Sequence, residues 1–324
     1  MVIPVVVVFA CCLWNALAWI DRPFAGFLFL ENGIVVSIGR TEWAPPQRRS
    51  AQWTRLVAVD GTPVAAAPEV QAYVNATGIG KPITYTFRQG TEMFRQAITV
   101  RAFARRDFVE LFAPMLGVGL LLVLTGAAIA WLRPDAPEVR ALFAVSASVG
   151  VNLITAPDAY APYWFTALYF LSLCLVPPAI VHVALAYPRQ RRLARAGPLV
   201  LAALYLPFAS LTVAFLLARW DPSVFLPLLY IVYVLIANAM LLYVGGLVLA
   251  MIDGLRPLAP LVLALGAVVG TCVLVATTLV AYPLMQRPIS PIWLLAPLLL
   301  NPLLTGVAFL RYPRPAPSAE EGVA

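Results

Sequence analysis

Charged residues are scarce in this chain of 324 residues. Asp, Glu, Lys and Arg together make up only 11% of the sequence, whereas 62% is hydrophobic. Soluble globular domains carry about 25% charged residues, so the composition excludes an ordinary soluble fold and predicts a polytopic membrane protein. Lys81 is the only lysine, although the net charge is +7. The net positive charge is attributed to arginines that flank membrane segments, so no nucleic-acid partner is expected.

Cysteine and histidine are also rare. The cysteines are Cys11, Cys12, Cys174 and Cys272, all in apolar stretches, and His182 is the only histidine. None of the cysteines has the spacing to another Cys or to His that a zinc site requires, so neither a metal site, a cofactor nor a disulfide framework is predicted.

The motifs of common enzymes and pumps are missing as well. The sequence contains no His-Glu-x-x-His, and Gly78–Pro82 lacks the glycine spacing of a phosphate loop. Glu110 and Asp253 lie at the ends of predicted spans, and the interiors of the spans carry no charged residue. Ion-coupled transporters usually need such buried groups. The missing motifs therefore predict that the protein is not an enzyme, and the missing buried charges count against an ion-coupled transporter.

About eight apolar segments reach the length of about 20 residues that crosses a bilayer. Residues 1–20 are predicted to form an uncleaved anchor helix, and residues 107–312 a bundle of seven helices. Residues 313–324, rich in proline and small side chains, are predicted to be a disordered cytoplasmic tail. The seven spans are expected at about 108–132, 138–156, 162–187, 198–218, 223–252, 257–282 and 290–311.

Arginines are unevenly distributed between the connections of these spans. One alternating set of connections carries only Arg219 and Arg287. The other set carries Arg133, Arg140, Arg189, Arg191, Arg192, Arg195, Arg256, Arg311 and Arg314. The positive-inside rule therefore places both termini in the cytoplasm and residues 21–106 outside it. We expect a multi-pass protein of the bacterial inner membrane, with membrane lipids around it.

Residues 21–106 differ from the rest because they hold half of the 22 basic residues and many turn-forming residues. Strands are predicted within 33–40, 54–61, 81–90 and 94–103, with a tight turn at Asp60-Gly61 and a hairpin turn at Gln89-Gly90. A short helix is predicted over 68–77. The short connection Ala102–Asp107 then joins this domain stiffly to the bundle.

The order of these elements resembles a bacterial-type PDZ domain. The residues concerned are "LVAVDGTPV" (Leu56–Val64), "PEVQAYV" (Pro68–Val74) and "GKPITYTFRQG" (Gly80–Gly90). Trp53-Thr54 stand where this family often has Gly-Asp. The resemblance implies a fold class of α-helical membrane protein with an inserted small β-rich PDZ-like domain, which would bind an extended peptide by adding it to a sheet edge.

The PDZ resemblance also implies a peptide site. Its carboxylate-binding loop would be "FAGFLF" (Phe24–Phe29), with Gly26 at the turn, and the helix would line the groove. The alternative is that the phenylalanines of this loop pack the domain onto the membrane or fill its own core. The candidate peptide-binding residues are Phe24, Gly26, Phe27, Leu28, Phe29, Val70 and Tyr73.

Together with this domain, "LRPDAPEVRALF" (Leu132–Phe143) and "VHVALAYPRQRR" (Val181–Arg192) resemble the membrane region of bacterial sensor proteins, including competence-type sensor histidine kinases. The resemblance implies a signal-transduction module with a cytoplasmic output protein. Only a short tail follows Arg311, so the chain is either a fragment of a larger sensor or passes its signal to a partner.

Two further alternatives remain at this point. The protein could be a transporter or lipid-handling permease with an accessory PDZ-like domain, or a scaffold that recruits envelope proteins. His182 could sense pH or a ligand, or be a hydrogen-bonded histidine at the membrane interface.

Overall fold

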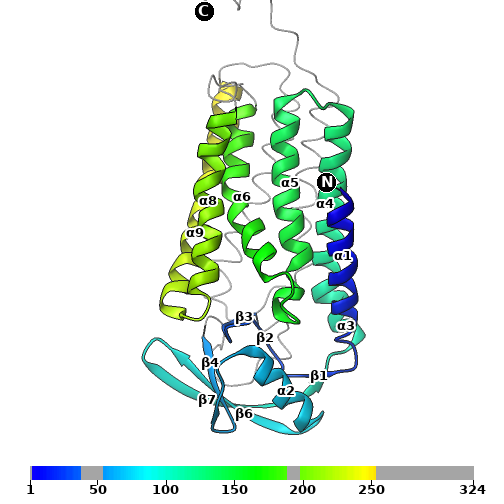
Figure 1. Cartoon of the computed structure of the whole chain (residues 1–324), viewed down its shortest axis with the longest axis vertical. Helices are drawn as coiled ribbons and strands as arrows, with labels where there is room; N and C mark the ends of the chain where they lie inside the picture. The colour runs from blue at the N-terminus through cyan, green and yellow to red at the C-terminus, as the bar shows by residue number, and fades with distance from the viewer. Residues whose placement is uncertain (1, 38–53, 188–197, 253–324) are drawn as a thin grey trace, which may run out of the picture.

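The computed structural model describes residues 2–37, 54–187 and 198–252 (Figure 1). These residues form a bundle of long helices with a small β-rich lobe at one end. Five of the described helices are long and apolar enough to cross a membrane, as expected of a polytopic membrane protein. The spans predicted at 257–282 and 290–311 lie outside the described residues, so the count of eight stays a prediction.

The five long helices follow the predicted spans closely. The first of them runs over Arg105–Leu132 and comprises α3 (Arg105–Asp107), a π-helical turn (Phe108–Phe112) and α4 (Ala113–Leu132). The largest difference is at the start of α6, because residues 157–165 form a loop that contains a short 3-10 turn. The other four are α5 (Pro137–Thr155), α6 (Thr166–Ala186), α8 (Pro198–Ala218) and α9 (Pro222–Ile252).

The predicted anchor helix is shorter than expected. Helix α1 (Val2–Leu17) has 16 residues and is therefore about 24 Å long, whereas the hydrocarbon core is about 30 Å thick. It lies beside α4 and α5 (Figure 1). Asn15 and Ala16 near its end are buried against the rest of the protein.

Helices α4 and α5 pack closely because both present glycines at their contact. A Cβ atom added to Gly119 or to Gly150 would lie 2.7 Å from the carbonyl oxygen of the other residue. A Cβ atom on Gly126 would lie 2.7 Å from the Cβ of Ser146. Small residues allow helix backbones to approach in this way, so these positions fix the spacing of the pair.

The lobe is built on a four-stranded antiparallel sheet with strand order β5-β4-β6-β7. A bridge between Ile34 and Arg55 joins it to the β2-β3 pair, and β1 pairs separately with β8. The strands are β1 (Pro23–Phe24), β2 (Leu28–Phe29), β3 (Val35–Ser37), β4 (Arg55–Val59), β5 (Thr62–Pro63), β6 (Pro82–Gln89), β7 (Glu92–Thr99) and β8 (Arg101–Ala102).

The turn at Asp60-Gly61 and the short helix of the lobe are those that the sequence predicts, whereas the second hairpin turn is at Gly90-Thr91, one residue after the predicted Gln89-Gly90. Asp60 and Gly61 both have positive φ, 45° and 81°, as a two-residue hairpin turn requires. The Asp60 carboxylate accepts hydrogen bonds from the backbone N–H of Thr84 at 2.7 Å and from the Tyr73 hydroxyl at 3.0 Å. The turn is thereby tied to β6 and to α2 (Ala67–Thr77), whose Val70 and Val74 are buried against the sheet.

Candidate functional site: the junction of lobe and bundle

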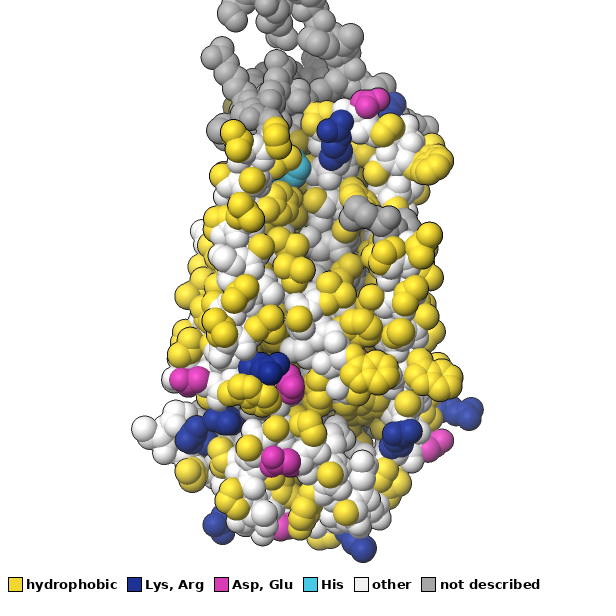
Figure 2. All heavy atoms as spheres, viewed as in Figure 1, with side chains coloured by type: hydrophobic (Ala, Val, Ile, Leu, Met, Phe, Trp, Pro, Cys, Tyr) yellow, Lys and Arg dark blue, Asp and Glu magenta, His cyan; other side chains and the backbone are white. Residues whose placement is uncertain are grey.

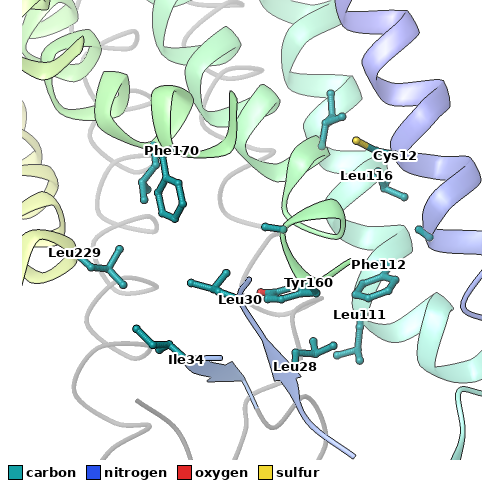
Figure 3. Close-up of a cluster of buried hydrophobic side chains, with 14 of the residues drawn as sticks. Cys12, Leu28, Leu30, Ile34, Leu111, Phe112, Leu116, Tyr160, Phe170 and Leu229 are labelled. Carbon is teal, nitrogen blue, oxygen red and sulfur yellow. The ribbon is translucent and has the colours of Figure 1, made fainter. Parts of the chain in front are cut away.

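One short segment of the lobe belongs to two hydrophobic cores. Buried side chains along Phe24–Leu30 alternate between the two cores, although the chain bends at Gly26 between β1 and β2. Phe27 and Phe29 face the core of the lobe, and Phe24, Leu28 and Leu30 face the bundle. We call the second cluster the junction core; it includes Leu28, Leu30 and Ile34 of the lobe together with Leu111, Phe112, Tyr160, Phe170 and Leu229 of the bundle (Figure 3).

Aromatic rings form the centre of the junction core. Phe103, at the end of the lobe, lies 5.4 Å from Trp19, 5.4 Å from Phe24 and 5.3 Å from Phe112 between ring centroids. Phe112 in turn stacks on Tyr160 at 6.3 Å. Each such pair contributes about 0.5–1.5 kcal/mol beyond its buried area. The rings therefore hold α1, β1, the start of α4 and the α5–α6 loop together.

The two chain segments that connect the lobe to the bundle are paired with each other. The N–H of Asp21 donates to the carbonyl of Phe103 at 2.9 Å, and the N–H of Phe103 donates to the carbonyl of Arg22 at 3.0 Å. The Asp107 carboxylate accepts a hydrogen bond from the N–H of Ala104 at 2.8 Å. The connection at Ala102–Asp107 is thus short and backbone-bonded, which is what a stiff link requires.

The loop between α5 and α6 contains a completely buried carboxylate, Asp158. It accepts hydrogen bonds from Asn15 Nδ2 of α1 at 3.1 Å and from the N–H of Phe165 at 2.7 Å. Burial raises the pKa of Asp158, and the hydrogen bonds from Phe165, Asn15 and Trp164 oppose that rise. Asp158 therefore ties the end of α1 to the start of α6.

The same loop reaches into both cores. Tyr160 belongs to the junction core, and Tyr163 packs against the core of the lobe. Tyr163 has a φ of 72°, a backbone conformation that costs about 1–3 kcal/mol for a residue with a bulky side chain. Its buried hydroxyl has no hydrogen-bond partner within the described part of the chain. Burial and the nearby Glu31 and Asp158 raise the pKa of Tyr163, so the phenol stays neutral.

Most of the predicted peptide-binding residues lie inside these cores. Gly26 has a φ of 89°, and a Cβ atom there would lie 3.0 Å from Ile98 Cγ2, so the position requires glycine. Tyr73 is 36% exposed and is bound to Asp60. The phenylalanines of this segment pack in hydrophobic cores, as the alternative interpretation expects. Peptide binding is not tested by this packing and stays a prediction. The buried members of the set are Phe24, Gly26, Phe27, Leu28, Phe29 and Val70.

His182 lies toward the end of the bundle that is opposite to the lobe (Figure 2). Its Nδ1 is 3.2 Å from the Tyr205 hydroxyl of α8, and the two rings meet edge to face at 6.0 Å. This contact is the hydrogen bond that the second interpretation of His182 expects. The sensor role is not tested by the contact and stays a prediction.

The sequence did not point to Asp158, whose carboxylate joins the end of α1 to the α5–α6 loop. Asp158 lies between the spans predicted at 138–156 and 162–187, and no role is predicted for it. The signal that could have found it is its position in "APDAYAPYW" (Ala156–Trp164), where it is the only charged residue among apolar and aromatic ones.

Among residues 2–37, 54–187 and 198–252, no group of three or more His, Cys, Asp and Glu side chains could hold a metal ion. Cys11, Cys12 and Cys174 are free thiols, and Cys272 lies outside this part of the chain. Comparison with protein-family models, with curated proteins and with solved structures found no match to this chain.

Proposed function

We propose that this protein is a membrane-embedded sensor. Its lobe, residues 21–106, would bind a peptide or a partner protein outside the cytoplasm and change the packing of the helices to which it is docked. The observation that carries this proposal is the segment Phe24–Leu30, which contributes side chains to the lobe core and to the junction core. Protein cores are close-packed, so a ligand that displaces one face of this segment also displaces the other.

The route into the membrane runs through the α5–α6 loop. Tyr160 contacts the junction core, and α6 begins six residues later at Thr166. Helix α6 is the most buried of the five candidate spans and contains Pro177 and Pro178, which interrupt its backbone hydrogen bonds. A shift of the loop would therefore reach the centre of the bundle and the far end, where a cytoplasmic output protein would bind.

The PDZ-like interpretation of the lobe agrees with the element order of β4, β5, α2, β6 and β7. Phe27 lies 5.0 Å from Tyr85 and 5.5 Å from Phe87 between ring centroids, so the face that a peptide would use is filled by the chain itself. A peptide that replaces Phe27 would move its neighbour Leu28 in the junction core. Binding would then be coupled directly to the bundle.

The test uses the full chain in lipid nanodiscs and a library of short peptides with free C-terminal carboxylates. We expect a peptide that binds to change hydrogen exchange both in the lobe and in residues 157–165. Phe112→Ala removes the ring that stacks on Phe103 and Tyr160 from the bundle side. This variant should keep peptide binding and lose the response of residues 157–165.

Trp131→Ala is the matched control, because Trp131 is 87% exposed at the other end of the same continuous helix. It should behave as the unchanged protein. The proposal is wrong if no peptide of the library binds. It is also wrong if a peptide binds to the protein without substitutions and the hydrogen exchange of residues 157–165 stays the same. The latter result would favour a scaffold, in which the lobe recruits partners without affecting the bundle.

A further inference from the structure

A cleft of about 230 Å³ lies where the lobe meets α1, at the edge of the junction. Its walls come from the end of α1, from β1, from α2 and from the α5–α6 loop. The side chains that matter for its chemistry are Asn15, Trp19, Arg22, Gln71, Asn75 and Trp164. The proposed sensor function does not use this cleft.

The lining of the cleft suits an anionic group. Arg22 is its one charged side chain, is exposed, and makes no ion pair with the described residues. Gln71 and Asn75 of α2 also line the cleft, as do Trp19 and Trp164, and all four side chains carry N–H groups that can donate hydrogen bonds. A phosphate oxygen accepts from such donors, and the guanidinium supplies the charge.

The cleft lies at the boundary of the apolar surface. On the face shown in Figure 2, hydrophobic side chains cover the bundle, and charged side chains gather over the lobe and at the opposite end. Trp164 is 67% exposed at the cleft, and aromatic rings of this kind prefer the headgroup region of a membrane. The cleft is therefore at the depth of lipid headgroups if the apolar band is the part that lies in hydrocarbon.

An exposed apolar stripe on α1 leads to the cleft. Ile3, Val7 and Trp14 are 79%, 56% and 73% exposed, and their spacing places them on one face of the helix. The next position of this face, one turn after Trp14, is Ala18, which lines the cleft. A chain of methylene groups that lies along the stripe would thus bring its headgroup to Arg22.

We infer that this cleft binds the anionic headgroup of a membrane lipid, with the acyl chains along α1. The lipid would contact α1, β1, α2 and the α5–α6 loop together, and would therefore strengthen the docking of the lobe. This inference is independent of peptide binding by the lobe, because it concerns a different surface and a different ligand.

The test measures quenching of tryptophan fluorescence in the full chain, purified in detergent, by lipids with brominated acyl chains. Brominated phosphatidylglycerol should bind about fivefold more tightly than brominated phosphatidylcholine, which is the factor expected for one arginine at a membrane surface. Arg22→Gln should remove this preference. Arg95→Gln also removes one positive charge, from an exposed position on β7 of the lobe, and should preserve the preference.

Two additional measurements locate the lipid and guard against a misfolded variant. Trp14→Phe should reduce the extent of quenching, because Trp14 lies on the exposed stripe of α1 along which the brominated acyl chains would run. Asn75→Asp places a carboxylate on the exposed side of α2 that lines the cleft, and should lower the preference for phosphatidylglycerol as Arg22→Gln does.

The inference is overturned if the two lipids bind equally or if Arg22→Gln retains the preference. It is also overturned if soluble glycerol phosphate displaces the lipid at equal concentration, since the cleft would then be a site for a free anion. Displacement by a peptide with a free C-terminal carboxylate would instead assign the cleft to a peptide ligand.

Discussion

The core of the lobe and the junction core share a chain segment but are built in different ways. The lobe core is local: apart from Tyr163, its side chains come from residues 25–100. The junction core gathers side chains from Cys12 to Val232 and lies against the buried carboxylate of Asp158. A local core can form with the lobe, whereas the junction forms only when distant helices have assembled. We therefore expect the junction to be the part that can open while the lobe stays folded.

Phe27 and Leu28 are neighbours in the sequence, but Phe27 packs in the lobe core and Leu28 in the junction core. Each core can therefore be disrupted by a separate substitution, and these two substitutions have the largest expected effects. Phe27→Ala should cost about 3–5 kcal/mol and Leu28→Ala about 2–5 kcal/mol, because both side chains are 2% exposed. In hydrogen-exchange measurements on the full chain in nanodiscs, Phe27→Ala should expose the amides of β6 and β7. Leu28→Ala should leave those amides protected and expose residues 103–112.

Met93→Ala serves as the control, since Met93 is 66% exposed on β7, and it should change neither region. If Phe27→Ala and Leu28→Ala expose the same amides, the two cores unfold as one unit and the comparison fails.

Asp158→Asn should have an intermediate effect of about 1–3 kcal/mol on thermal unfolding. An asparagine offers one carbonyl oxygen in place of the two carboxylate oxygens that accept from Asn15 and Phe165. The effect should depend on pH. Because burial raises the pKa of Asp158, the folded state holds the proton more tightly than the unfolded state. The contribution of this carboxyl to stability then increases as pH falls through the raised pKa toward the unfolded value of about 3.9.

The cost of Asp158→Asn should therefore be larger at about pH 4.5 than at neutral pH, as measured by the difference from the unchanged protein at each pH. Asp135→Asn, on the exposed α4–α5 connection, should stay within about 0.5 kcal/mol. A cost of Asp158→Asn that is the same at both pH values would show that the carboxyl is not desolvated.

The smallest effect is expected for Arg219→Gln. Arg219 of the α8–α9 connection lies 3.7 Å from Glu31 of the lobe, and its side chain is 41% exposed. Such partly exposed pairs contribute about 0–1 kcal/mol and are screened by salt. Thermal unfolding at low and high salt should show a small difference that disappears at high salt. A larger cost, or one that salt does not change, would mean that this contact contributes to docking as much as the core does.

The sequence predicts local structure well in this protein. The turn at Asp60-Gly61, the helix 68–77 and the hairpin 81–103 follow from turn chemistry and side-chain periodicity, and the structure has all three. The described spans follow from apolar length alone. Both signals lie within short windows of sequence, so they do not depend on how the lobe and the bundle meet.

The junction could not be predicted in the same way. The alternation in Phe24–Leu30 shows that two faces exist, but not which core each face fills. The two-residue strands β1 and β8 are too short to show a period, although their pairing connects the lobe to the bundle. Asp158 bonds to Phe165 of its own loop and to Asn15 of the distant helix α1, and only the first of these partners is near it in the sequence. Each of these features depends on contacts between distant segments.

The glycine contacts between α4 and α5 have a mechanical consequence. The close approach of Gly119 and Gly150 favours movement of the two helices as one unit. They form a fixed axis beside the point where the chain leaves the lobe at Phe103. A lobe that rocks about this axis moves little near α4 and most at the greatest distance from it. The amplitude should therefore be greatest beside the α8–α9 connection, where a distance measurement between lobe and bundle would be most sensitive.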